Sequence, residues 1–265
     1  MSSSVSEPEY VFDNARSEAQ TRLTALEAFY DPVTIRHLEP VVTPGSHCLE
    51  VGAGSGSIAR WMSGRVGPTG RVVATDINTR LLASVAASNV EVRQHNIVSD
   101  PLEAGAFDLA HTRLVLVHLP ERKHVVERLI AALKPGGWLV LQEFESVRAD
   151  PATFEGEHLL KTLVAMQDLM VDRGADNKFG RRLFPILSSA GLDEVAAEGH
   201  IILLQGGRPE AELLRANFSQ LHEALITSGR LTEQEFSEDV ARLDDPAIIW
   251  PSQILWTVRG RKRGP

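Results

Sequence analysis

The 265-residue sequence predicts an α/β fold in which helices cover both faces of a largely parallel sheet. Two observations support this prediction. Short apolar runs alternate with stretches of helical periodicity through the first half of the chain, as in strand–helix–strand units. The first apolar run also ends in a turn with glycine at three alternate positions, Gly52, Gly54 and Gly56. A buried strand that passes through such a turn into a helix is typical of α/β sheets that bind a nucleotide cofactor.

The glycine turn itself narrows the choice of cofactor. Glycine tolerates backbone angles that other residues avoid, and it lets a ligand approach the main chain. A nicotinamide or flavin turn would have a third glycine where this chain has Ser57. The pyrophosphate of a dinucleotide would also be repelled by Glu50, whereas a cofactor with an amino group would be attracted to this carboxylate.

The remaining core elements follow in order along the chain. A second strand ends in Asp76, 20 residues beyond Gly56, where a carboxylate can accept hydrogen bonds from both ribose hydroxyls. The predicted strands cover residues 47–51, 71–76, 90–95, 107–112 and 138–144, with helices from Ile58 onward and over about 121–133. The second of these helices is ended by the sequence Lys-Pro-Gly-Gly at 134–137.

In this order the motifs resemble those of the class I S-adenosylmethionine-dependent methyltransferases. The resemblance covers roughly residues 45–145 and includes the acid-and-three-glycine turn, the acid that ends the second strand, and Leu-Lys-Pro-Gly-Gly before the fifth strand. It implies a Rossmann-like, seven-stranded sheet and S-adenosyl-L-methionine as cofactor. The ubiquinone/menaquinone-biosynthesis C-methyltransferases and secondary-metabolite methyltransferases are the similar enzymes.

The resemblance also assigns residues to the cofactor. Asp76 would bind the ribose, and Asn96, where the family commonly has an acid, would accept from the adenine amine through its amide oxygen. Tyr10 and Arg22 would contact the methionine end, although exposed polar positions on an amphipathic helix are the alternative. The other predicted cofactor residues are Glu50, Gly52, Ala53, Gly54, Gly56, Ile77, Ile97, Thr112 and Arg113.

Segments outside this core are predicted to be mainly helical. Residues 1–40 would form an N-terminal helical cover, with a helix that ends at Asp31–Pro32, and residues 41–265 would form the core domain. Insertions at about 150–180 and 207–246 would form a helical lid above the strand ends. Their predicted helices cover about 152–173 and begin at Pro209 and Thr232, and the sheet would be completed by a helix over 184–190 and strands over 194–204 and 253–258.

The lid predicts an enclosed, largely apolar acceptor site. Met166 and Met170 lie on one side of the helix over 152–173 and could line that site, but plain core packing is the alternative. Glu143, at the end of the fifth strand, could orient an acceptor hydroxyl or amine, or it could be a solvated acid.

Two histidines are candidate general bases. His118 follows the fourth strand near the position where the methyl group should emerge, and imidazole titrates near neutral pH. A packing or capping role is the alternative. His111 is the second candidate, although its place inside a strand also fits a buried histidine with satisfied hydrogen bonds.

Charge and composition argue against several function classes. A formal net charge of −8 argues against a nucleic-acid partner. Cys48, the only cysteine, lies in the first strand as a core residue. No uncharged run approaches the ~18 residues of a membrane span, and no secretory leader is visible, so we expect a cytoplasmic protein. No metal site is predicted, because no paired-histidine motif occurs.

The sequence therefore predicts methyl transfer to a hydrophobic small molecule with a phenol, enol, quinone-like or amine acceptor. Three alternatives stay open. The bound cofactor could assist a rearrangement or cyclisation without methyl transfer, the chain could be a nicotinamide-dependent oxidoreductase, or it could bind the cofactor without turnover.

Overall fold

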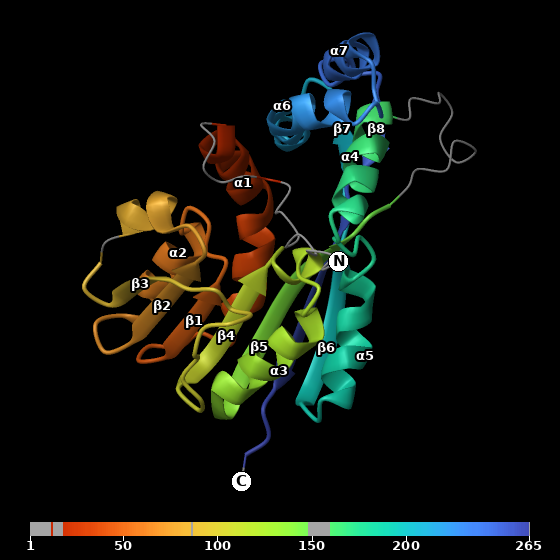
Figure 1. Ribbon diagram of the computed structural model, residues 1–265. Helices are drawn as coiled ribbons and strands as arrows, with labels where there is room; N and C mark the ends of the chain where they lie inside the picture. The colour runs from red at the N-terminus through yellow and green to blue at the C-terminus, as the bar shows by residue number, and fades with distance from the viewer. Residues whose placement is uncertain (1–11, 13–17, 86, 148–159, 265) are drawn as a thin grey trace, which may run out of the picture.

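A seven-stranded sheet forms the centre of the molecule (Figure 1). The computed structural model describes residues 12, 18–85, 87–147 and 160–264. The strand order is β3-β2-β1-β4-β5-β9-β6, and β9 is antiparallel to both of its neighbours. The strands are β1 (His47–Val51), β2 (Arg71–Asp76), β3 (Val90–Gln94), β4 (Phe107–Arg113), β5 (Leu133–Glu145), β6 (Asp193–His200) and β9 (Ile254–Arg261). The predicted seven-stranded sheet is confirmed.

Each face of the sheet has its own apolar core, because side chains alternate along the strands. Leu49 belongs to one core and Cys48 to the other, and both are fully buried. Cys48 is thus the core residue that the sequence predicts. The helices on the first face are α3 (Arg122–Ala132) and α5 (Leu183–Ser189), and those on the second are α2 (Ser57–Val66) and the C-terminal end of α1 (Glu18–Leu38).

Three further helices lie beyond the carboxyl ends of the strands (Figure 1). We call α4 (Lys161–Asp172), α6 (Ala211–Thr227) and α7 (Glu233–Arg242) the outer helices. They pack around one apolar cluster, in which Phe218 and Leu225 are fully buried. A two-stranded ribbon of β7 (Leu203–Gln205) and β8 (Ile249–Pro251) joins α6 and α7 to the sheet.

The N-terminal helix is longer than predicted. The expected end at Asp31–Pro32 is wrong, because α1 continues to Leu38 with Pro32 inside it. A proline inside a helix removes one backbone hydrogen bond and costs about 3 kcal/mol. Burial of Leu38 and the hydrogen bond from Thr34 Oγ1 to Gln142 Oε1 hold the second half of the helix against the sheet. Tertiary packing therefore overrides the local signal.

The predicted sixth strand is two strands. The expected run over 194–204 breaks after β6, and β7 turns away to pair with β8, a strand that the sequence analysis missed. Ile202 marks the break, since its N–H donates to Ser252 Oγ over 3.2 Å and its C=O accepts from Ser252 N–H over 2.8 Å. The last strand is also longer than predicted, because β9 continues to Arg261.

The start of α7 is as predicted. Thr232 Oγ1 accepts from Glu235 N–H over 3.2 Å, and the Glu235 carboxylate accepts from Thr232 N–H over 3.1 Å, which completes a capping box. Of the predicted helix over 152–173, residues 152–159 lie outside the described part of the chain. No helix among the described residues is long and apolar enough to span a membrane.

Candidate cofactor and active site

The glycine turn between β1 and α2 has the backbone conformation that its sequence predicts. Gly52, Gly54 and Gly56 have φ angles of +73°, +59° and +82°, in the left-handed region that other residues rarely adopt. A Cβ at Gly52 would lie 2.2 Å from Val115 Cγ2, and one at Gly56 would lie 2.2 Å from Val85 Cγ2. Conformation and packing therefore both require glycine at these two positions.

Asp76, at the end of β2, supports this turn. Its carboxylate accepts hydrogen bonds from the backbone N–H of Gly54 and of Asn78, each over 3.0 Å. Burial raises the pKa of Asp76, while these backbone donors lower it. The neighbouring Ile77 is 58% exposed, whereas Ala53 is buried. The predicted ribose acceptor and an exposed apolar side chain thus lie side by side at the turn.

Asn96 and Ile97 form part of the turn after β3. Asn96 Oδ1 accepts from Val98 N–H over 2.9 Å, and Asn96 N–H donates to Asp100 Oδ2 over 2.8 Å. The Asn96 side chain is exposed, and Ile97 is buried in the core. The amide oxygen therefore shapes the turn, and its second lone pair is the part that a ligand could use.

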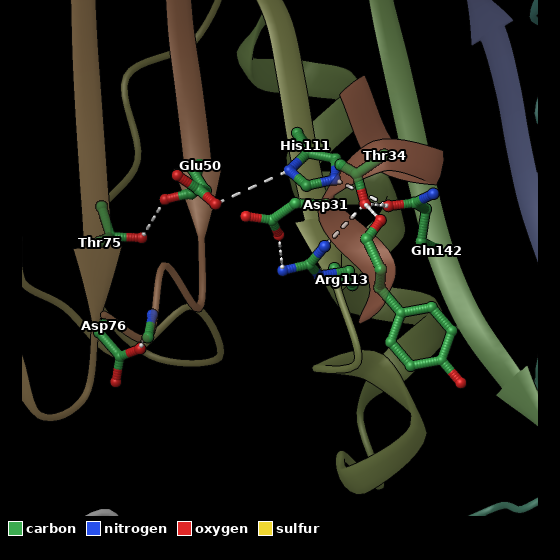
Figure 2. Close-up of polar contacts among 10 residues, drawn as sticks. Asp31, Thr34, Glu50, Thr75, Asp76, His111, Arg113 and Gln142 are labelled. Carbon is green, nitrogen blue, oxygen red and sulfur yellow. Dashed lines mark hydrogen bonds and ion pairs between the residues drawn. The ribbon is translucent and has the colours of Figure 1, made fainter. Parts of the chain in front are cut away.

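Glu50 and His111 face each other on the neighbouring strands β1 and β4, beneath α1 (Figure 2). Glu50 Oε1 lies 4.0 Å from His111 Nδ1. Among the described residues, neither Glu50 Oε2 nor His111 Nδ1 has a hydrogen-bond partner, and both atoms are buried. Burial raises the pKa of Glu50 to about 8 and lowers that of His111 to about 3. Both side chains thus favour their neutral forms at neutral pH in the free protein.

Helix α1 lies over the glycine turn and the carboxyl ends of β4 and β5 (Figure 1). Four of its side chains, spaced along one face, contact the sheet or the turn. Leu23 packs against Gly54, and Glu27 accepts a hydrogen bond from the Ser55 hydroxyl. Asp31 accepts from Arg113, and Thr34 binds both Arg113 and Gln142 (Figure 2).

The structure places Arg113 and Thr112 in the scaffold of the site. The Arg113 guanidinium donates to Asp31 Oδ1 over 2.8 Å and to Thr34 Oγ1 over 2.7 Å, and the side chain is 10% exposed. Thr112 is fully buried, and its Oγ1 has no partner within the part of the chain that the structure describes. Arg113 therefore fixes α1, and a direct cofactor contact by either residue stays a prediction.

Glu143 is buried, so it is not the solvated acid that the sequence offered as the alternative. Its carboxylate is fully buried and accepts three backbone N–H groups, those of Val115 and Leu116 at Oε1 and that of Val117 at Oε2, over 2.7–3.1 Å. Burial raises the pKa of Glu143 to about 8, and the three donors oppose this shift. The side chain supports the loop after β4, and a contact with a substrate stays a prediction.

His118 ends the short helix η2 (Leu116–His118) in the loop that Glu143 supports. Burial lowers the pKa of His118 to about 4, and the positive charges of Arg22 and Arg122 add to this effect. Arg22 is buried on α1 and stacks on the Phe12 ring, with its Cζ 4.6 Å from the ring centroid. Tyr10, the other residue predicted to contact the methionine end, lies outside the described residues.

Met166 and Met170 belong to the cluster between the outer helices. Met166 is buried and Met170 is partly buried, and Phe12 from the N-terminal segment packs in the same cluster. Both methionines therefore contribute to the packing of these helices, and a contact with a substrate stays a prediction.

The sequence analysis missed the part of the site that α1 supplies. Glu27 contacts the glycine turn, and Asp31 contacts Arg113 on β4. Thr34 donates a hydrogen bond to Gln142 on β5. The signal was present in the polar residues at 27, 31 and 34, which recur at the spacing of one helix face. The assumed helix end at Asp31–Pro32 concealed it.

The residues fit a cofactor with a cationic amino end. The three glycines of the turn have no side chains of their own, and the buried Glu50 Oε2 lacks a donor among the described residues. A buried carboxylate oxygen without a partner is costly, so a ligand donor at this position would stabilise it. Asp76 and Ile77 supply a polar and an apolar contact at the other side of the turn.

Comparisons with known proteins agree with this geometry. The family described as "Methyltransferase domain" matches residues 49–141. The chain is 34% identical to methyltransferase str2 of Strobilurus tenacellus over 180 residues, which are 67% of this chain and 64% of that protein. It is 32% identical to the ubiquinone/menaquinone biosynthesis C-methyltransferase UbiE of Ectopseudomonas mendocina over 111 residues, which are 39% of this chain and 43% of that protein. The chain thus spans less than two-thirds of either relative.

The fold is also similar to that of a solved methyltransferase structure. This is the Haemonchus contortus phosphoethanolamine N-methyltransferase 2 in complex with phosphomonomethylethanolamine and S-adenosylhomocysteine. The TM-score is 0.61 at 14% identity, over 97% of this chain and 61% of that one. At this identity the similarity supports the fold alone.

Proposed function

Because the chain belongs to the class I S-adenosylmethionine-dependent methyltransferases, we propose that it transfers a methyl group from this cofactor to a hydrophobic small molecule. The observation that carries the proposal is the buried Glu50 carboxylate beside a turn of three left-handed glycines. The ionised form of Glu50 needs a donor at this buried position, and the cofactor's ammonium group is one.

The other cofactor contacts in the proposal follow from position. Asp76 would receive the ribose hydroxyls in addition to the two backbone N–H groups that it already binds, and Ile77 would pack against the adenosine. Asn96 would contact the adenine. When bound, the cofactor supplies an electrophilic methyl group on a sulfonium, and its sulfur leaves as a neutral thioether.

The chain's own contribution to transfer is alignment and proton removal. Alignment of the reacting groups can supply about 7–11 kcal/mol of the barrier. Glu143 holds the loop that carries His118, and His118 is neutral at pH 7 because burial keeps its pKa low. It can therefore accept the proton that a phenol, enol or amine releases as the acceptor atom bonds to the methyl carbon.

The outer helices support an apolar acceptor. They lie beyond the carboxyl ends of the strands and share one apolar cluster that reaches Phe12 in the N-terminal segment. We infer that they act as a lid over residues of the core domain, with Met166 and Met170 on its inner side. The predicted cytoplasmic location and the predicted absence of a nucleic-acid partner stay predictions.

The experiment that tests this function has a binding part and a turnover part. Calorimetric titration compares S-adenosylmethionine with NADH, and we expect heat of binding for the first alone. The protein is then incubated with S-adenosylmethionine and a panel of phenols, enols, quinols and amines, and S-adenosylhomocysteine is quantified. Formation of this product, with a methylated acceptor of matching mass, supports the proposal.

Three outcomes would contradict it. Binding of NADH alone would favour an oxidoreductase. Tight binding of S-adenosylmethionine with conversion of an acceptor to an isomer of unchanged mass, and no S-adenosylhomocysteine, would favour a rearrangement or cyclisation. Binding without conversion of any acceptor class would favour a binding protein.

A further inference from the structure

A chain of buried hydrogen bonds runs from α1 through the sheet to His111 (Figure 2). Arg113 donates to Thr34 Oγ1 over 2.7 Å, and Thr34 Oγ1 is 2.7 Å from Gln142 Oε1. The Thr34 hydroxyl accepts from Arg113 and has one proton to donate. Its two possible acceptors are Gln142 Oε1 at 2.7 Å and Tyr30 O at 3.1 Å, and it donates to the nearer, Gln142 Oε1. On the far side of the amide, Gln142 Nε2 donates to Thr257 Oγ1 over 2.8 Å.

These contacts fix which way the Gln142 amide lies. Its oxygen points toward Thr34 and its nitrogen toward Thr257, so the oxygen is also the atom that faces His111 Nε2, at 3.5 Å. An amide oxygen accepts hydrogen bonds and cannot donate them. The neutral imidazole of His111 therefore has its proton on Nε2, and its Nδ1 presents a lone pair toward Glu50.

Once Glu50 is ionised, as an ammonium ligand requires, two acceptors thus face one another with no donor between them in the described residues. His111 Nδ1 lies 4.0 Å from Glu50 Oε1, which is too long for a hydrogen bond, and both Nδ1 and Glu50 Oε2 are buried without partners. Two acceptors that bind the same nitrogen are typically about 4–5 Å apart, given hydrogen bonds near 2.9 Å and tetrahedral donors. An ammonium group has three donors and would satisfy both residues.

We propose that His111 binds the ammonium group of the cofactor together with Glu50, and that Thr34 and Gln142 are positioning residues that set its tautomer. The proposal deepens the proposed function and rests on the cofactor that it assigns. It replaces the predicted role of His111 as a base, since Nδ1 faces the cofactor site's carboxylate. It also makes α1 part of the ammonium site, because Thr34 belongs to that helix.

Binding measurements without turnover test the proposal separately from methyl transfer. S-adenosylhomocysteine carries the ammonium group, and 5′-methylthioadenosine has the same adenosine and thioether without it. We expect His111→Phe to raise the Kd of S-adenosylhomocysteine about tenfold, as for one lost hydrogen bond to a charged group, and to leave the Kd of 5′-methylthioadenosine unchanged. His111→Asn places an amide oxygen near Nδ1 and should restore most of the affinity.

Thr34→Val tests the positioning role with a variant of the same size. It should raise the Kd of S-adenosylhomocysteine, as His111→Phe does, but by a smaller factor. In the His111→Phe background, Thr34→Val should have no further effect on this Kd. Glu198→Gln is the matched control, because it removes the exposed partner of Arg36 on the same helix, away from His111. It should change neither Kd.

The outcomes separate the possibilities. If His111→Phe raises the Kd of both ligands equally, His111 has a general structural role. If it changes neither Kd, His111 has no role in binding. Each result overturns the proposal. A loss of kcat at unchanged Kd would return His111 to the role of base. Failure of methyl transfer with the expected Kd pattern would overturn the proposed function and leave this inference standing.

Discussion

Asp31 on α1 accepts a hydrogen bond from Arg113 at the end of β4 over 2.8 Å, with 19% and 10% of the two side chains exposed. This pair joins the N-terminal helix to the sheet close to the glycine turn. A partly buried pair of this kind is screened little by solvent, so its removal has consequences for both the helix and the site.

We expect Asp31 and Arg113 to be energetically coupled. In a double-mutant cycle with Asp31→Ala and Arg113→Ala, urea unfolding should give a coupling free energy of about 1–3 kcal/mol. The matched control is the cycle on Arg36 and Glu198, an exposed pair that joins the same helix to β6, which should give about 0–1 kcal/mol. Equal coupling in the two cycles would show that the Asp31–Arg113 contact does not anchor α1.

Gly56→Ala should destabilise the protein more than Gly191→Ala. Both glycines have positive φ angles, +82° at Gly56 and +77° at Gly191 after the end of α5, so alanine is strained at each by about 1 kcal/mol. A Cβ at Gly56 would also meet Val85 Cγ2 at 2.2 Å, while nothing lies within 4 Å of a Cβ at Gly191. The added overpacking should cost about 1–3 kcal/mol, measured as the difference in free energy of unfolding. Equal destabilisation would mean that the turn can move away from Val85.

Glu143→Gln should loosen the loop after β4. The amide nitrogen of glutamine cannot accept the N–H that Oε2 now accepts from Val117, so two donors would face each other. We expect a loss of about 1–3 kcal/mol in unfolding free energy and a lower kcat, because His118 lies in this loop. Glu127→Gln, exposed on α3, is the control and should change neither quantity. Wild-type stability and turnover would mean that the loop does not depend on the carboxylate.

Cofactor affinity should rise with pH between about pH 6 and 8. Burial raises the pKa of Glu50 to about 8; Arg113 lowers it, while Asp31, Asp76 and Glu27 raise it further. An ammonium ligand prefers the carboxylate, so below pH 8 binding must release a proton from Glu50. Calorimetry of S-adenosylhomocysteine in buffers of different ionisation enthalpy measures this release. In Glu50→Gln the affinity should be low and independent of pH over this window, and a pH slope that survives in that variant would contradict the assignment.

The raised pKa of Glu50 should make the free protein less stable as the pH rises, although cofactor affinity increases over the same range. Between pH 4.5, the ordinary pKa of a glutamate, and about 8, the folded state retains a proton on Glu50 that the unfolded state has lost. The contribution of Glu50 to the free energy of unfolding therefore falls as the pH rises through this window. A saturating cofactor should reverse the trend.

His118→Ala should slow methyl transfer without weakening the binding of the cofactor. The pKa of His118 is lowered to about 4, so its imidazole stays neutral from pH 6 to 9 and its titration should not limit the wild-type rate in that range. Loss of a general base typically costs about 10²–10⁴-fold in rate. His124→Ala removes an exposed histidine on α3 and serves as control. Wild-type turnover in His118→Ala would exclude His118 as base.

The sequence was most informative where local chemistry determines the structure. Glycines at 52, 54 and 56 predicted the turn, and the Thr232–Glu235 spacing predicted the start of α7, because both features depend on residues close together in the chain. Glu143 shows that contacts between residues distant in the chain were not predicted. Its position at a strand end was predicted, but the three donors that bind it come from residues 26–28 positions away, and only the fold brings them together.

Pro32 shows a second limit. Proline is a reliable local signal for a helix end, yet the burial of Leu38 and the contacts of Thr34 to the sheet offset its cost. The early end that we assigned to α1 removed Thr34 from the helix and so hid the polar face that reaches the site. One wrong boundary therefore concealed the residues that link the N-terminal segment to His111.

The β7–β8 ribbon has a consequence for how this chain can diversify. Residues 203–251 leave the sheet and return to it at adjacent points, since Ile202 and Ser252 are joined by two hydrogen bonds. The ends of the segment that carries α6 and α7 are thus clamped together, whatever lies between them. Exchange of that segment for another of different length or composition should leave the ends of β6 and β9 in register, so α6 and α7 form a replaceable unit on a constant sheet.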